Sequence, residues 1–184
     1  MEEIIRQIIH IYAGIIIAAI ALVLGLQITS YILFLLLLLI LIYINSVLVY
    51  GGPGRLNNIT RKEENSIFPA KGAVFYFASL LFLSSFQHIN LSTFIAACLA
   101  LAIGDGFSTL GGRAFNTKGK SFIGSFLGFI PLLFSYILIG FPLIFSFLTA
   151  FFAMLMERYA VIDDNIWVPF SVAAWVSLLY TFGI

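Results

Sequence analysis

The chain has 184 residues, of which 62% are hydrophobic and only 9% are charged, and its formal net charge is +1. Soluble domains carry about 25% charged residues, so this composition excludes an ordinary water-soluble fold. A charge balance this close to zero gives no reason to expect a nucleic-acid partner. The single cysteine, Cys98, excludes an intrachain disulfide and a cysteine-based metal cluster.

Apolar runs follow one another along the whole chain, separated by short polar or turn-prone segments. We expect each run to form a transmembrane helix, because crossing the hydrocarbon takes about 20 apolar residues. The seven expected helices cover 8–26, 31–50, 70–87, 89–106, 122–140, 141–157 and 166–184. Together they nearly exhaust the length. The sequence therefore predicts an all-α, polytopic integral membrane protein with a single domain over residues 1–184. The divisions near 88 and 141 rest on turn-prone residues inside long apolar stretches.

The charged residues follow a simple pattern along these helices. The connections at 27–30, 88–90 and 140–142 hold no charge. All nine Lys and Arg lie before the first helix or in or directly beside the other connections, and the acids sort in the same way. With seven helices, every charge lies on one side of the membrane, and the Lys/Arg bias of cytoplasmic loops assigns that side to the cytoplasm. Because acids gather there as well, we expect a polar site at the inner face.

The connection between the fourth and fifth helices has the most distinctive chemistry. Read from Gly104, at the end of the fourth helix, to Ser121, it combines five glycines with three cations and several hydroxyl groups. Glycine lets backbone N–H groups approach an anion without a Cβ in the way, and the first N–H groups of the next helix favour negative charge. We therefore predict a Gly-rich cytosolic loop that binds a di- or triphosphate; a flexible loop that only orients the chain is the alternative. The expected nucleotide-binding residues are Gly104, Gly106, Ser108, Thr109, Gly112, Arg113, Asn116, Lys118, Lys120 and Ser121.

Four acidic residues flank the apolar runs at this face. Asp105 ends the fourth run, and an acid among cations and phosphates favours Mg²⁺, which prefers carboxylate and phosphate oxygens. Asp163 and Asp164 either contribute to the same metal or nucleotide site or only help to cap the last helix, for which Asp164 or Asn165 is the expected cap. Glu157 ends the sixth run, where the helix dipole disfavours an acid. Glu157 therefore needs a partner, either Arg158 or Arg6 or a bound cation.

Separated segments of the chain match the motifs of one enzyme family. The matching residues are Gly104-Asp105-Gly106, Gly112-Arg113, Lys120 through Ser125, Glu157-Arg158-Tyr159, Asp163-Asp164-Asn165 with Pro169, Arg6 through His10 with Gly14, and, more weakly, Lys71 through Tyr76. In these segments the chain resembles the dolichol kinase, phytol kinase and CTP-dependent diacylglycerol kinase family. Gln7 stands where that family usually has lysine. Arg6 and His10 stand four residues apart and share a helix face. They are expected to bind the nucleotide, and anchoring at the membrane interface is the alternative.

The resemblance implies a multi-pass enzyme that phosphorylates a membrane lipid alcohol with CTP as the donor. The residues themselves indicate phosphate, metal and membrane, whereas the choice of CTP comes from the resemblance alone. In the expected mechanism Mg²⁺ is held by Asp105 with Asp163 or Asp164, and either Asp105 or Glu157 takes the hydroxyl proton. Dolichol, polyprenols, phytol, geranylgeraniol and diacylglycerol all stay open as acceptors. The oligomeric state stays open too, because apolar helix faces contact lipid and protein alike.

Three other classes of membrane protein share some of these features. A cytidylyltransferase that forms CDP-lipids also uses CTP and a metal, but its SxxKR and HGGxDRxD signatures are missing from the sequence. A prenyltransferase of the UbiA type needs spaced DxxxD motifs, which are also missing. A small multi-pass transporter usually places ionisable residues near mid-membrane, whereas the centres of the expected helices hold none. The lipid kinase is therefore the leading prediction.

Overall fold

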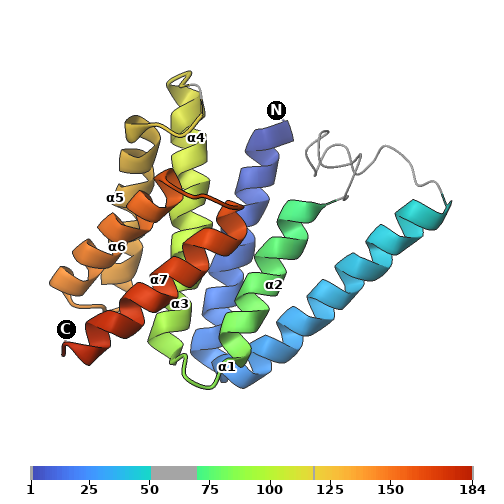
Figure 1. The fold of residues 1–184 in the computed structure, drawn as a ribbon, viewed down its shortest axis with the longest axis horizontal. Coiled ribbons are helices and arrows are strands. Elements are labelled where there is room, and N and C mark those ends of the chain that lie inside the picture. The colour runs from blue at the N-terminus through green and yellow to red at the C-terminus, as the bar shows by residue number, and fades with distance from the viewer. Residues whose placement is uncertain (1, 51–69, 118, 184) are drawn as a thin grey trace.

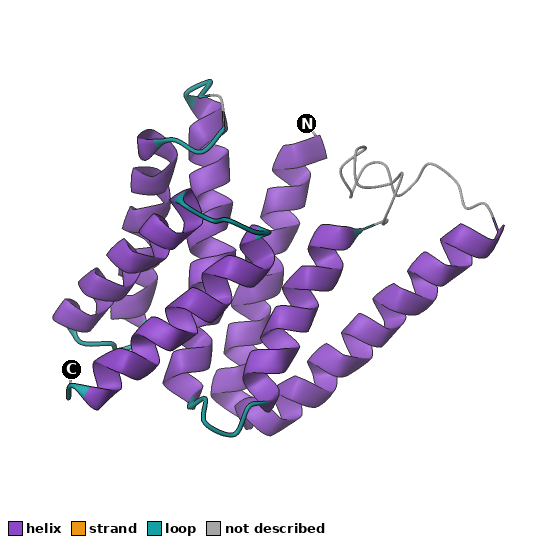
Figure 2. Ribbon diagram, viewed as in Figure 1, coloured by secondary structure: helices purple, strands orange, loops and turns teal. Residues whose placement is uncertain are grey.

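The computed structural model describes residues 2–117 and 119–183, apart from 51–69 (Figure 1). Within these residues the chain is helical with short connections and contains no strand (Figure 2), which confirms the all-α prediction. The elements are α1 (Glu2–Tyr50), α2 (Lys71–Ser85), α3 (Leu91–Leu99), the π-helix η3 (Ala100–Asp105), α4 (Gly106–Ala114), α5 (Phe122–Leu138), α6 (Leu143–Arg158) and α7 (Asp164–Thr181).

Two helical stretches are long and apolar enough to cross a membrane. They are Ile4–Val49, which is α1, and Leu91–Ala114, which is the continuous helix formed by α3, η3 and α4. The most apolar window of the first is mostly exposed within the structure, whereas that of the second is mostly buried. The second stretch thus lies at the centre of the bundle, whereas a large part of the first faces outward.

α1 consists of two arms that meet at Gly25. The backbone there has φ 81° and ψ 169°, a conformation that glycine adopts without the strain a Cβ would cause. The arms correspond to the predicted helices 8–26 and 31–50, but the predicted connection at 27–30 is helical and belongs to the second arm. In Figure 1 the first arm lies within the bundle, and the second arm runs back toward the same end while leaning away from it.

The predicted divisions near residues 88 and 141 are confirmed. α2 and α3 are separated by residues 86–90, and α5 and α6 are separated by residues 139–142. Both connections lie at the end of the bundle where α1 turns at Gly25, and they carry no charge (Figure 1). The charged residues in the described part of the chain lie toward the opposite end. The charges at 55–64 and Lys118 lie outside the described residues.

The central helix forms the core of the bundle. Every residue from 93 to 106 is buried, and four of them, Ala96, Ala97, Ala100 and Ala102, are small and fully enclosed. Small side chains let neighbouring helices approach closely, which is how apolar helices pack when all of them are equally hydrophobic. α1, α5 and α7 contact both α3 and η3, and α6 contacts η3.

The glycine-rich segment between the fourth and fifth runs is mostly helix. The prediction of a loop beginning at Gly104 is wrong for residues 104–114, and the connection between α4 and α5 shrinks to 115–121. Glycines on both sides of the contact bring α4 and α5 together. A Cβ on Gly124 would lie 2.8 Å from the carbonyl oxygen of Ser108, and a Cβ on Gly128 would lie 2.5 Å from that of Gly104. Packing against α5 therefore overrides the low helix propensity of glycine in this segment.

We expect Gly128→Ala to lower the free energy of unfolding by about 1–3 kcal/mol, because the added Cβ meets a backbone carbonyl that cannot move aside. Thermal unfolding of the purified protein in detergent measures the effect. Phe134→Ala on the same helix is the control, since the Phe134 side chain is 61% exposed, and we expect it to stay within about 0.5 kcal/mol of the wild type. A Gly128→Ala variant as stable as the control would contradict this close helix contact.

Candidate functional site

A cavity of about 500 Å³ lies between the two arms of α1, α2, the junction of η3 and α4, and the segment that leads into α7. Its polar lining includes Arg6, Gln7, His10, Tyr76, Asp105, Thr109, Lys120, Asp163, Asp164 and Asn165. Its apolar lining includes Ile9, Ala13, Ile40, Tyr43, Ala73, Phe77 and Ile162. One part of the cavity wall is therefore charged and another part is apolar.

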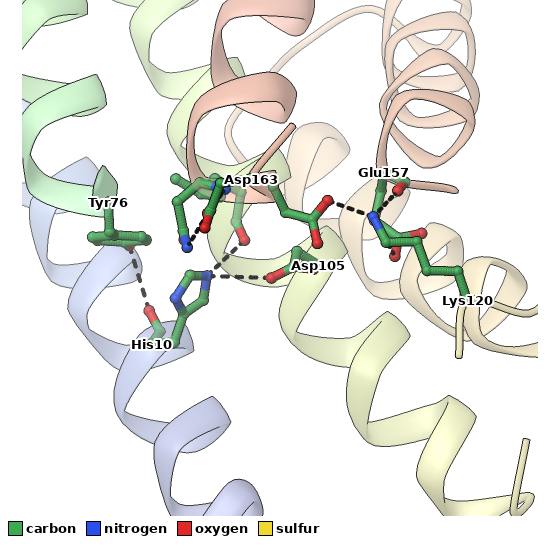
Figure 3. A network of polar contacts seen from close by, with 9 residues as sticks. His10, Tyr76, Asp105, Lys120, Glu157 and Asp163 are labelled. Atoms are coloured by element: carbon green, nitrogen blue, oxygen red, sulfur yellow. Dashed lines mark hydrogen bonds and ion pairs between the residues drawn. The ribbon is translucent and has the colours of Figure 1, made fainter. Parts of the chain in front are cut away.

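His10 and Asp105 face one another from the first arm of α1 and the end of η3 (Figure 3). Nε2 of His10 lies 3.7 Å from Oδ2 of Asp105 and 2.9 Å from the carbonyl oxygen of Leu101. Since a carbonyl can only accept, Nε2 carries the hydrogen in this arrangement. Leu101 and Asp105 are four residues apart in the π-helix, close to one turn, so both present oxygens to His10. Single π-helical turns occur frequently at functional sites.

Tyr76 in α2 holds His10 in place. The two rings meet edge to face with their centroids 4.5 Å apart, and the Tyr76 hydroxyl donates to the backbone carbonyl of His10 at 3.4 Å (Figure 3). Tyr76 is buried, so its hydroxyl is kept away from competing water. It belongs to the weak motif match from Lys71 to Tyr76 but was not among the predicted site residues.

Lys120 joins the α4–α5 connection to α6 and α7. Its Nζ donates to the carboxylate of Asp164 and to the backbone carbonyl of Glu157, and it lies 4.0 Å from Oε1 of Glu157 (Figure 3). The other carboxylate oxygen of Glu157 accepts from Ser125 at 3.3 Å. Glu157 is only 2% exposed, so its charge depends on these partners. The cationic partner of Glu157 is therefore Lys120, and not Arg158 or Arg6, which the sequence had suggested.

Arg158 and Arg6, the two cations that were expected beside Glu157, have other neighbours. Arg158 stacks over the ring of Phe122, with 3.5 Å between its guanidinium carbon and the ring centroid. Arg6 lines the cavity and attracts the charge of Asp105 from there.

Asp163 and Asp164 have different roles. Asp163, rather than Asp164 or Asn165, caps α7: its Oδ1 accepts from the backbone N–H of Asn165 at 3.1 Å. Its Oδ2 lies 3.7 Å from Nζ of Lys71. Both oxygens of Asp163 are thus engaged, whereas Asp164 binds Lys120 at the cavity wall. Asp164 is therefore the member of the pair that is better placed to take a ligand.

The cavity carboxylates Asp105 and Asp164 do not form a complete metal site by themselves. Among the described residues, no three His, Cys, Asp or Glu side chains gather into a complete metal site. Mg²⁺ is usually bound by one or two carboxylates together with water and substrate phosphates, so a complete protein cage is not required. Repulsion from Asp164 and Glu157 acts on Asp105 and is only partly offset by Lys120 and Arg6. A divalent cation between Asp105 and Asp164 would relieve that repulsion.

The predicted site residues divide between the cavity and its surroundings. Those that line it are Arg6, His10, Asp105, Thr109, Lys120, Asp163 and Asp164. Those that are buried between helices instead are Gly104, Gly106, Ser108, Gly112 and Glu157. Arg113 and Asn116 are exposed near the end of α4, and Ser121 caps α5 by accepting from the N–H of Gly124 at 3.0 Å. Lys118 lies outside the described residues. The structure thus brings Asp105, Lys120 and Asp164 together, and their roles in binding stay predictions.

Comparisons of the chain with protein-family models, curated proteins and solved structures give no match. The likeness to the lipid kinase family therefore rests on the motifs in the sequence.

Proposed function

We propose that the protein is a membrane kinase that transfers the γ-phosphate of CTP to the hydroxyl of an isoprenoid lipid alcohol. The observation that carries the proposal is the cavity in which Asp105, Asp164 and Lys120 meet an apolar wall. A phosphate donor and its metal need the charged groups, whereas a lipid acceptor needs the apolar ones. The nucleotide base is assigned from the motif resemblance, in which Gly104-Asp105-Gly106 and Lys120 through Ser125 are the most specific matches.

The proposal includes seven membrane spans with the cavity near the cytoplasmic face. The spans are the two arms of α1, α2, the continuous α3–η3–α4 helix, α5, α6 and α7. In the described part of the chain, the charged residues lie toward the end of the bundle opposite to the uncharged connections at 86–90 and 139–142, which supports this topology (Figure 1). The bias of Lys and Arg toward cytoplasmic loops supports its orientation.

In the proposed reaction the lipid hydroxyl oxygen attacks the γ-phosphorus, the bond from that phosphorus to the bridging oxygen breaks, and CDP leaves. Catalysis of this kind consists mainly of positioning and charge stabilisation. Lys120 and Arg6 offset the phosphate charge. Asp105 and Asp164 would hold Mg²⁺, which draws charge away from the phosphate oxygens. Asp105 also has a second oxygen that can accept the hydroxyl proton, and it lines the cavity, whereas Glu157 is buried behind Lys120.

Purified protein incubated with labelled CTP and a panel of lipids tests the proposal. The panel contains polyprenol, phytol, geranylgeraniol, diacylglycerol and phosphatidate, and CTP carries the label in its γ-phosphate or in its cytidine. Transfer of the γ-label to an alcohol is the expected result. Cytidine label in a lipid product would identify a cytidylyltransferase instead, and no labelled lipid in either series would contradict the kinase and favour a transporter.

The substitution Glu157→Gln tests whether Glu157 positions Lys120 or acts as the general base. The change keeps the shape of the side chain and its contact with Ser125 but removes the negative charge that faces Nζ of Lys120. We expect the KM for CTP to rise about 3- to 10-fold with kcat nearly unchanged, because Lys120 is held less firmly at the phosphate. Steady-state kinetics measure both constants. A loss in kcat of about 100-fold or more would make Glu157 the base and would overturn this assignment.

A further inference from the structure

The second arm of α1 presents one narrow stripe to the bundle. Thr29, Leu33 and Ile44 are buried, at spacings of four and eleven residues that put them on one helix face, while most of the remaining arm is exposed. Leu33 is fully buried in this contact, and Ile44 is nearly so. Between them the contact is looser, since Ile40 is only partly buried and Tyr43 is 47% exposed.

The cavity reaches the outside of the bundle at this loosened contact. Ile40 and Tyr43 of the second arm line it together with Ala73 and Phe77 of α2. Since Tyr43 is both exposed and part of the lining, it stands at an opening. Another side of the cavity is lined by Asp163, Asp164 and Asn165 at the start of α7, preceded by Ala160 and Ile162 in the connection from α6. The cavity thus has an apolar side between helices and a polar side at a connection.

The size of the cavity limits how much of an acceptor lipid it can enclose. A volume of about 500 Å³ is within the range of pockets that enclose one small ligand, about 300–1,000 Å³. Such a space accommodates a phosphate group with an alcohol headgroup but not a long hydrocarbon chain. The chain of an acceptor must therefore leave the cavity, and the side that lets it do so without contacting charged groups is the one between the second arm and α2.

We propose that the acceptor lipid enters sideways through a portal between the second arm of α1 and α2, formed by Ile40, Tyr43, Ala73 and Phe77. The hydroxyl reaches Asp105, and the hydrocarbon chain extends past Tyr43 along the exposed face of the arm. The apolar opening is continuous with the charged wall of the cavity. This arrangement fits an amphipathic lipid, which has an apolar chain and a polar end, better than a second copy of the chain. That the lipid is an alcohol rests on the proposed function. The route through the portal rests only on the lining of the cavity.

Ala73→Trp tests the portal. Ala73 is an exposed residue of α2 that lines the cavity, so a large ring there blocks the opening without entering the core. We expect phosphorylation of geranylgeraniol to fall at least ~10-fold, while phosphorylation of the short alcohol prenol and the KM for CTP stay within about 2-fold, because only the chain is excluded. Ala174→Trp is the matched control, since Ala174 is exposed on α7 outside the cavity lining. Equal losses with both alcohols, or no loss with geranylgeraniol, would overturn the portal.

A second measurement needs no turnover. A geranylgeraniol analogue with a diazirine near its hydroxyl end is photolysed with the wild-type protein in detergent, and the labelled peptides are identified by mass spectrometry. Label at 40–43 and 73–77 that unlabelled geranylgeraniol displaces is the expected result. Label spread evenly over exposed helix faces, or a covalent dimer through the second arm, would overturn it. If no alcohol is phosphorylated in any assay, the proposed kinase fails, and the photolabel still decides the route.

Discussion

The substitution Asp105→Asn is expected to lower phosphate transfer to the lipid at least ~100-fold while the protein still folds. Asparagine keeps the shape of the side chain but cannot accept the hydroxyl proton and binds a divalent cation poorly. Asp105 is only 8% exposed and is repelled by Asp164 and Glu157, so a neutral amide costs less to bury there than the carboxylate. Initial rates with γ-labelled CTP measure transfer, and thermal unfolding in detergent measures the fold.

Asp163→Asn is the matched control for this substitution. It makes the same chemical change at a residue of the same cavity, but asparagine also caps helices well, and both oxygens of Asp163 are already engaged with Asn165 and Lys71. We expect a loss of only several-fold. Near-normal turnover in Asp105→Asn, or equal losses in the two variants, would refute the special role of Asp105.

Lys120→Met is expected to raise the KM for CTP about 30-fold or more, the usual cost of losing a hydrogen bond between a charged donor and a charged acceptor. It should also lower the free energy of unfolding by about 1–2 kcal/mol, since Glu157 is left buried without its cation while the partly exposed lysine is screened by solvent. The two effects arise from different partners, the bound nucleotide and the protein itself.

The double variant Lys120→Met with Glu157→Gln separates these effects. Removing both charges leaves a neutral pair, so we expect most of the lost stability to return. The affinity for CTP should stay as low as in Lys120→Met alone, because the nucleotide still lacks its cation. Recovery of CTP affinity together with stability would indicate that Lys120 acts only as a structural partner of Glu157.

The helix pattern could be predicted from the sequence where local signals were strong. Turn-prone residues at 87–90 and 140–142 separate long apolar runs, and helices end there as expected. The break in the first long helix falls at Gly25 instead of the polar residues 27–30, because positive φ is open to glycine and the polar side chains remain helical. The segment 104–114 could not be predicted in this way. Its helical state depends on contact with α5, which lies later in the chain.

The charged residues of the site could be predicted because they are rare. In a chain with 9% charged residues, Asp105, Lys120 and Asp164 stand out, and the structure brings them to one cavity. Tyr76 could not be recognised in the same way, since 16% of the residues are aromatic and only its contact with His10 distinguishes it. The division of roles between Asp163 and Asp164 also depends on geometry, namely on which carboxylate reaches back to cap α7.

The most direct test of a shared site for nucleotide and lipid is a structure with Mn²⁺ in place of Mg²⁺ and a CTP analogue whose β–γ bridging oxygen is a methylene group. We expect the manganese to be coordinated by Asp105 and Asp164, the γ-phosphate to lie beside Lys120, and a soaked geranylgeraniol to place its hydroxyl at the same phosphate. A triphosphate bound outside the cavity, along the exposed end of α4 at Arg113 and Asn116, would contradict the shared site.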